Sequence, residues 1–225
     1  MREILDRQMA KLNLQIQDLG RLAIGQVEGS IQAVEQRDAA LAMRVAEADS
    51  VLDDAESAID GFVIRVMALQ QPEATDLRRL LAALRIGVAL ERIGDHAKTV
   101  AKRVPAICDR LALPIDPDFL AIAHLALEEV TDVMRAYETG DADLALAIRA
   151  RDVGLDRRYV GYSEKLLQAM EADPKLVRPG TFLLYAARNY ERIGDQATNI
   201  AERIHFALRG QLPAEERQRP TAAVS

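Results

Sequence analysis

The sequence predicts an all-α protein made of two tandem, structurally similar three-helix bundles, with six long antiparallel helices. Three observations support this prediction. The composition favours helices, because 49% of the 225 residues are apolar, only 4% are aromatic and tryptophan is absent. Apolar residues recur at steps of three and four along long stretches of the chain, which is the period of an amphipathic helix. One stretch of thirteen residues also occurs twice, one hundred residues apart.

The repeated stretch lies at residues 91–103 and again at residues 191–203. The two copies read ERIGDHAKTVAKR and ERIGDQATNIAER, and eight of the thirteen positions are identical. A second similarity, at an offset of 103, relates residues 38–49 to residues 141–152. Chance does not readily produce both matches, so we interpret the chain as a duplication of one three-helix unit.

The helices of each half follow from the apolar period and from the residues that interrupt it. Asp38 has the position of an N-cap, the prolines at positions 72 and 174 break helices, and Gly210 has the position of a C-cap. Long helices with short connections favour an antiparallel bundle. The expected helices span residues 3–36, 39–70 and 74–109 in the first half, and about 118–139, 142–172 and 178–209 in the second.

The boundaries of the halves follow from the same pattern. We expect the first repeat to span residues 1–110 and the second to span residues 118–210. Two prolines at positions 114 and 117 mark the linker between them. Residues 211–225 lack an apolar period, so we expect a mobile tail.

Charge and composition exclude several classes of function. The net charge of −6 and the pI near 5.2 give no electrostatic support for nucleic-acid binding. The single cysteine, Cys108, excludes an internal disulfide and a cysteine-based metal site. No stretch approaches the roughly 18 apolar residues of a membrane span. The N-terminus is charged throughout and does not resemble a signal peptide, so we expect a cytoplasmic protein.

Each half carries two pairs of carboxylates spaced one helical turn apart. Like charges at this spacing disfavour a helix by a few tenths of a kcal/mol. Gly94 and Gly194, in mid-helix, each cost about 1 kcal/mol relative to alanine, and we interpret them as points of close helix approach. Because both copies retain these penalties, we infer a role other than helix stability. The pairs are Asp49 with Asp53, Glu91 with Asp95, Asp152 with Asp156, and Glu191 with Asp195.

Convergence of these pairs would create a site for a hard cation in each half. Asn199 and Glu202 extend the second acidic stripe by one and two turns, where the first half has Thr99 and Lys102. Oxygen ligands of this kind suit magnesium, calcium, manganese or iron. The alternative is a solvated acidic face whose charges are paired with nearby arginines. The arginines available for such pairs are Arg92, Arg103, Arg192 and Arg203.

Two other classes of protein remain as alternatives. The first is a metal-dependent, di-iron-like enzyme, in which glutamates and Glu-x-x-His motifs face the bundle core. We disfavour it because Glu91 and Asp95 lie opposite the apolar seam of their own helix. We also find no phosphate loop, nucleophile elbow or Ser-His-Asp order. The second alternative is a ligand-free structural adaptor. His96 is expected at the surface, and Cys108 as a small apolar filler.

The doubled E-R-I-G-D block, with D-x-x-x-D on the preceding helix, resembles the PhoU family of bacterial phosphate-signalling proteins. The resemblance covers nearly the whole chain. It implies two three-helix bundles and a non-enzymatic regulator of phosphate homeostasis. That regulator negatively modulates the high-affinity phosphate transporter and the phosphate-starvation two-component signalling. Its partners would be the sensor histidine kinase of the phosphate regulon, the ATPase subunit of the phosphate ABC transporter, and a second copy in a homodimer.

The resemblance also implies metal binding by the acidic motifs on the bundle surface. The metal would be divalent or trivalent, and iron, manganese, magnesium, zinc and calcium all remain open. Thr99 and Lys102 depart from the family pattern, which weakens the case for a multinuclear cluster in the first half. The implied ligands are Asp49, Asp53, Glu91, Asp95, Asp152, Asp156, Glu191, Asp195, Asn199 and Glu202.

Overall fold

The structure is a computed structural model that describes residues 2–106 and 115–213. These residues fold mainly into helices. No strand occurs within those two ranges, so the prediction of an all-α protein is confirmed. The elements are α1 (Arg2–Gln36), α2 (Ala39–Gln70), α3 (Ala74–Ala101), α5 (Pro117–Thr139), α6 (Ala142–Ala172), η1 (Pro174–Leu176) and α7 (Val177–Arg209).

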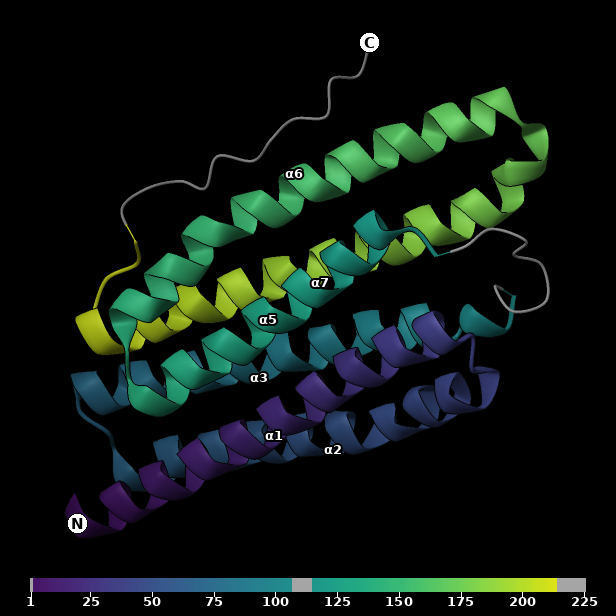
Figure 1. The fold of residues 1–225 in the computed structure, drawn as a ribbon. Helices are drawn as coiled ribbons and strands as arrows, with labels where there is room; N and C mark the ends of the chain where they lie inside the picture. Colours follow the sequence, from purple (N-terminus) through teal and green to yellow (C-terminus); the bar gives the residue numbers. More distant parts are fainter. Residues whose placement is uncertain (1, 107–114, 214–225) are drawn as a thin grey trace.

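The helices form two similar bundles that lie side by side. Helices α1, α2 and α3 pack against one another, and so do α5, α6 and α7. The halves meet where α3 contacts α7 and where α1 contacts α5. Figure 1 shows α6 along one edge of the molecule, α1 and α2 along the opposite edge, and α3, α5 and α7 between them. Helix α7 therefore has neighbours on several sides.

Capping residues set several of the helix ends as the sequence predicts. The carboxylate of Asp38 accepts a hydrogen bond from the backbone N–H of Leu41 at 2.9 Å. Asp141, its counterpart in the second half, accepts from two backbone amides at the start of α6. Gly140 and Gly210 end their helices with φ of 65° and 80°, the left-handed conformation that glycine adopts readily.

Helix α3 ends at Ala101, and residues 104–106 are helical again after a two-residue turn, so the single helix predicted to residue 109 is interrupted. The N–H of Arg103 bonds to the carbonyl of Val100 at 3.0 Å, only three residues back, so the chain tightens at this point. The prediction for Cys108 and most of the predicted linker lie outside the described residues, as does the tail beyond residue 213. The short helix η1 was not predicted.

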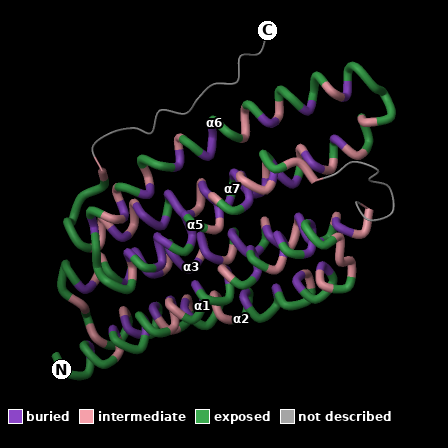
Figure 2. The backbone as a smooth tube through the Cα atoms, in the orientation of Figure 1, coloured by how far each residue is buried: buried purple, intermediate pink, exposed green. Residues whose placement is uncertain are grey.

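The core consists of the apolar faces that the periodicity marked. Figure 2 shows the buried residues along the helix faces that point toward other helices. At the centre, Tyr190 is fully buried and packs edge-on against Phe119, with ring centroids 5.9 Å apart. Its hydroxyl lies 3.2 Å from the Oγ of Ser30, which links the two halves. The apolar residues spaced three and four apart along the first part of α1 are all buried: Leu5, Met9, Leu12, Ile16, Leu19 and Ala23.

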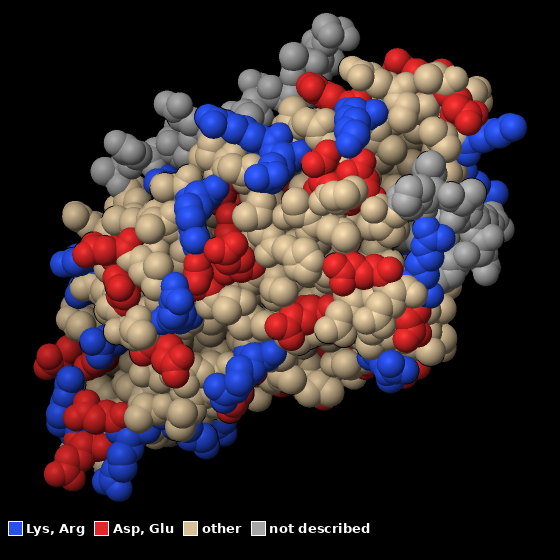
Figure 3. Space-filling model, in the orientation of Figure 1, with Lys and Arg blue, Asp and Glu red and all other residues tan. Residues whose placement is uncertain are grey.

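The surface carries charges of both signs close together. Figure 3 shows acidic and basic side chains interspersed over the face in view, with neither sign forming a continuous stripe. Among the described helices, none has both the length and the apolar character needed to cross a lipid bilayer.

Candidate metal centre

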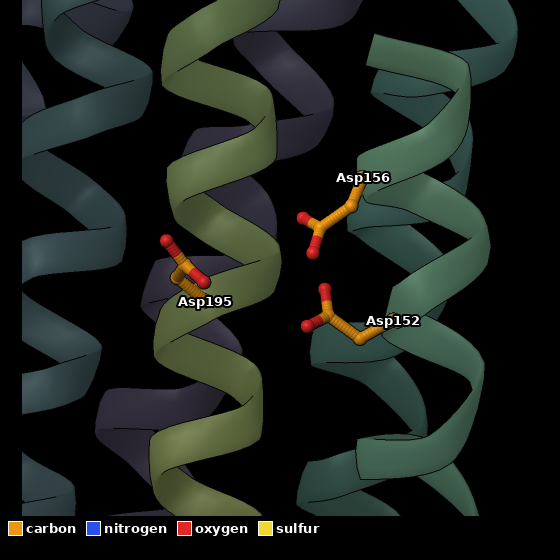
Figure 4. A group of neighbouring side chains, drawn as sticks. All are labelled: Asp152, Asp156 and Asp195. Atoms are coloured by element: carbon orange, nitrogen blue, oxygen red, sulfur yellow. The ribbon is translucent and has the colours of Figure 1, made fainter. Parts of the chain in front are cut away.

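Three carboxylates of the second half converge between α6 and α7. One oxygen each from Asp152, Asp156 and Asp195 lies within 4.8 Å of the other two. Figure 4 shows Asp152 and Asp156 projecting from α6 toward α7, which carries Asp195. Oxygen ligands bind Mg²⁺ at about 2.1 Å and Ca²⁺ at about 2.4 Å, so opposite ligands are about 4.2 to 4.8 Å apart. The spacing of this acidic trio therefore fits one hard cation.

The acidic trio lies largely inside the protein. Asp152 is 0% exposed and Asp156 is 6% exposed, while Asp195 is half-buried. The hydroxyl of Thr198, on α7, donates a hydrogen bond to Oδ2 of Asp152 at 3.1 Å and orients that carboxylate. The expectation of a site on the bundle surface is therefore wrong for the two aspartates of α6.

Glycine allows α6 to approach α7 at this point. A Cβ on Gly194 would lie 2.3 Å from Cδ2 of Leu155 and 2.8 Å from Oδ1 of Asp152, both too close for real atoms. In the first half, a Cβ on Gly94 would lie 2.9 Å from Cδ1 of Leu52. The interpretation of these glycines as points of close helix approach is confirmed.

A buried carboxylate that the sequence analysis missed lies beside the acidic trio. Glu129 of α5 is 4% exposed, and its Oε2 lies 2.9 Å from the same hypothetical Cβ on Gly194. At the offset of 103, Glu129 corresponds to Gln26, which is also buried. The signal available in the sequence was a polar residue at the same position in both repeats, on a helix face that is otherwise apolar.

The other candidates of the second half do not join the acidic trio. Glu191 is 6% exposed and accepts a bond from Nη1 of Arg188 at 2.5 Å. Glu202 accepts a bond from Nε of Arg149 at 3.0 Å. Asn199 is exposed and donates to a neighbouring glutamine side chain. The structure therefore narrows the candidate ligands of the second half to three residues.

A lysine occupies the equivalent place in the first half. The ammonium of Lys98 binds the carboxylate of Asp49, which is 3% exposed, and lies 3.2 Å from Oδ1 of Asp95. The bond to Asp49 raises the pKa of Lys98 well above its usual range. At the corresponding position the second half has the neutral Thr198. The first half therefore supplies its own cation through a side chain that the sequence analysis did not single out.

The remaining acids of the first half repel one another. Burial, as the largest cause, and the nearby carboxylates of Asp95, Asp53 and Glu56 together raise the pKa of Glu91 to about 7. Within the described residues, the acidic trio of the second half is the one group of three carboxylates close enough for a single cation. The structure thus distinguishes two halves that the sequence pattern treated as similar.

None of the three histidines joins the acidic trio in the described residues. His205 follows Glu202 by three residues, so the sequence does contain one Glu-x-x-His, which the sequence analysis missed. However, Nδ1 of His205 bonds to a backbone carbonyl, and Glu202 bonds to an arginine. His96 is half-buried between the halves instead of on the surface, with Nδ1 3.1 Å from Oδ1 of Asn189. His124 bonds to Glu35 at 3.1 Å.

The expected arginine pairs also differ from the observed ones. Arg103 lies over the ring of Tyr185 at 3.7 Å and donates to a backbone carbonyl instead of a carboxylate. In the part of the chain that the structure describes, Arg92, Arg192 and Arg203 form no ion pair. The ion pairs with the candidate carboxylates are formed instead by lysine and arginine side chains that the sequence analysis did not consider.

The comparisons with known proteins place the fold and both motif copies in one family. The PhoU domain model matches residues 16–104 and again residues 119–204. The chain belongs to the PhoU family. Phosphate-specific transport system accessory protein PhoU homolog from Rhizobium meliloti (strain 1021) is 39% identical over 217 residues, which are 94% of this chain and 90% of the relative. The resemblance inferred from the doubled block is therefore confirmed.

Solved structures of the PhoU family agree with the observed architecture. The crystal structure of PhoU from Pseudomonas aeruginosa has a TM-score of 0.89 at 31% identity, covering 92% of this chain and 99% of that chain. The phosphate transport system regulatory protein PhoU from Streptococcus pneumoniae has a TM-score of 0.86 at 25% identity, with 94% and 100% covered. These names describe accessory and regulatory proteins instead of enzymes, in agreement with the expectation of a non-enzymatic protein.

Proposed function

We propose that this PhoU-family chain is a regulatory accessory protein of a phosphate-specific transport system. In this role it restrains the high-affinity phosphate transporter and the phosphate-starvation two-component signalling, and it works in the cytoplasm. The proposal is carried by one observation: both halves match the family, and relatives named accessory proteins of that system align over more than nine-tenths of the chain.

We further propose its partners. They are the sensor histidine kinase of the phosphate regulon, the ATPase subunit of the phosphate ABC transporter, and a second copy of this chain in a homodimer. Mixed charges on the surface suit protein partners more than nucleic acid. Contact with membrane complexes would pass through these proteins.

Deletion of the gene tests the regulatory role. In phosphate-rich medium, the deletion strain is expected to switch on a phosphate-starvation reporter and to take up more phosphate, and the intact gene is expected to reverse both effects. A reporter that stays off in the deletion strain would contradict the proposal. Pull-down of the tagged chain from phosphate-replete cells, followed by mass spectrometry, tests the two named partners.

We propose that the acidic trio holds one divalent or trivalent metal ion, from the set iron, manganese, magnesium, zinc and calcium. The ligands would be Asp152, Asp156 and Asp195, which supply only oxygen atoms. When bound, the cation would offset the charge of the three carboxylates. Because the ligands come from two helices, the cation would also tie α6 to α7.

Calorimetric titration with Mn²⁺ tests this cation site. The wild-type chain is expected to bind one ion, and the Asp152→Asn/Asp156→Asn variant none. The matched control is Asp49→Asn/Asp53→Asn, which alters the equivalent residues of the first half and is expected to keep the ion. Equal uptake by all three proteins would place the metal elsewhere. Elemental analysis of protein purified without chelators distinguishes a metal binder from a ligand-free structural adaptor.

A further inference from the structure

A hollow of about 450 Å³ lies where the two halves meet, between α3 and α7. The repeat places the same residue of each copy in this seam hollow: Arg92 from the first and Arg192 from the second. A third arginine, Arg188, lines it as well. The contact between the halves thus brings together three guanidinium groups that are far apart in the sequence.

The three arginines of the seam hollow differ in their partners. Arg188 bonds to Glu191 on its own helix. Among the residues that the structure describes, Arg92 and Arg192 form neither a hydrogen bond nor an ion pair. Two guanidinium groups at one hollow repel each other, and an anion bound between them would offset that repulsion. Arginine presents paired N–H donors that match the oxygens of a phosphate group.

His96 also lines the seam hollow, and its pKa responds to the charge of both guanidinium groups. Burial lowers the pKa of His96, and Arg192 and Arg92 both lower it further, against the opposing effects of Asn189 and Asp95. Its Nδ1 lies 3.1 Å from Oδ1 of Asn189, a residue of the other half. The imidazole is therefore anchored across the seam, beside both arginines.

The seam hollow also contains acceptors, which restrict the kind of anion that fits. Asp95 and Asp195 both line it, and an ionised carboxylate accepts hydrogen bonds but donates none. A fully deprotonated anion such as sulfate meets repulsion from these oxygens. Monohydrogen phosphate carries two negative charges, which attract the arginines. It also has one O–H, which can donate a hydrogen bond to a carboxylate. A site built to bond an O–H rejects an analogue that lacks it.

We propose that the seam hollow binds inorganic phosphate in its monohydrogen form. Arg92 and Arg192 bind the phosphate oxygens, and the carboxylate of Asp95 accepts a hydrogen bond from the phosphate O–H. The assignment depends neither on metal in the acidic trio nor on the regulatory role proposed above, because it follows from the residues of the hollow alone.

Isothermal titration with inorganic phosphate tests the proposal on the full chain, stripped of metal by a chelator and returned to metal-free buffer. Arg92→Gln and Arg192→Gln are each expected to weaken binding at least tenfold, because each removes a charge-assisted contact. Both side chains are exposed and form no ion pair with another described residue, so both variants are expected to keep the wild-type melting temperature. Arg65→Gln, which alters an exposed arginine of α2, is the matched control and is expected to bind like wild type.

Competing anions distinguish phosphate recognition from general attraction of charge. Sulfate and glycerol phosphate, which lack the O–H on a dianionic group, are expected to bind at least tenfold more weakly than phosphate. Asp95→Asn is expected to bring the affinities for phosphate and sulfate closer together. Equal affinities for the three anions in the wild type would overturn the proposal. Phosphate binding that requires Mn²⁺ and survives Arg92→Gln would also overturn it, because the anion would then lie on the metal.

Discussion

At the scale of single residues, Lys98 and Thr198 are the clearest difference between two halves that share one ancestor. Both residues follow the E-R-I-G-D block at the same distance. Lys98 neutralises Asp49, whereas Thr198 donates a hydrogen bond to Asp152, the equivalent carboxylate. A buried carboxylate needs a compensating partner, and the two halves meet this need with different groups.

Replacing each of these two residues by the other tests their separate roles. Lys98→Thr leaves Asp49 buried without its cation, so we expect a loss of about 2 to 4 kcal/mol of stability in metal-free buffer. With Mn²⁺, this variant is expected to bind one ion per chain, as wild type does, because the first half has no described group of three carboxylates close enough for a second ion. Titration calorimetry would count the ions. The mirror change, Thr198→Lys, brings an ammonium group to the acidic trio and is expected to abolish metal binding. A Lys98→Thr variant as stable as wild type, or a Thr198→Lys variant that still binds Mn²⁺, would contradict this account.

Glu91 predicts a pH dependence of stability that can be checked directly. Its folded-state pKa of about 7 lies above the ordinary value of 4.5, so the folded chain favours the protonated form. Its contribution to stability is complete below pH 4.5 and is lost as the pH rises through 7. Glu91→Gln is therefore expected to match wild type near pH 4.5. At pH 8 it should be more stable by about 1 kcal/mol, after a discount for solvent screening.

Urea unfolding at pH 4.5 and at pH 8 measures this difference. Glu164→Gln, at an exposed position of α6, controls for the general effect of removing one negative charge. Between pH 4.5 and pH 8, the Glu91→Gln variant is expected to lose less stability than wild type. An equal loss in both proteins would show that the Glu91 carboxylate does not cause the pH dependence.

At the scale of elements, the sequence predicted helices well and burial less well. The bounds of α1, α2, α6 and α7 lie within one residue of those expected, because caps, prolines and the apolar period act locally. The burial of Glu191 and Asp152 could not be predicted in the same way. Helix α7 is covered by α3, α5 and α6, so residues outside its main apolar seam are buried as well.

The candidate site shows the same limit. The period of four identified all three members of the acidic trio, but it followed each helix separately. It therefore missed Lys98, which lies three residues from Asp95, and Glu129, which α5 brings in from a distant part of the sequence. Which carboxylates meet a cation, and which meet a lysine or an arginine, depends on contacts between helices.

The close approach of α6 and α7 predicts unequal effects for two equivalent substitutions. Gly194→Ala inserts a Cβ against Leu155 and Asp152, so we expect a loss of about 1 to 3 kcal/mol. We also expect Mn²⁺ binding to weaken at least tenfold, because Asp152 must move. Gly94→Ala meets only the end of a leucine side chain and is expected to cost less. Gly154→Ala, with open space around it, is expected to stabilise by up to about 1 kcal/mol.

Thermal unfolding with and without Mn²⁺ compares these three variants. The order of melting temperatures is expected to be Gly154→Ala, Gly94→Ala and Gly194→Ala, from highest to lowest. If Gly94→Ala and Gly194→Ala melt together and bind Mn²⁺ equally, the close approach at residue 194 has no special role.

At the scale of the whole molecule, the seam between the halves brings two charged sites together. Asp195 belongs to the acidic trio between α6 and α7 and also lines the seam hollow between α3 and α7. Its half-buried carboxylate thus belongs both to the proposed cation site and to the proposed anion site. The duplication alone does not create this link, because the matching residue of the first half, Asp95, is paired with Lys98.

This shared residue predicts that Mn²⁺ and phosphate bind cooperatively. A cation on the acidic trio offsets the negative charge of Asp195, which otherwise repels phosphate in the seam hollow. An effect of about 1 kcal/mol between charges near a protein surface corresponds to roughly fivefold tighter phosphate binding. Coupling between two ligands is reciprocal, so phosphate must tighten Mn²⁺ binding by the same factor. Titration of each ligand, with and without a saturating amount of the other, measures both factors. The Asp152→Asn/Asp156→Asn variant is expected to bind phosphate with an affinity that no longer depends on Mn²⁺. If Mn²⁺ still tightens phosphate binding in this variant, the coupling does not arise from the acidic trio.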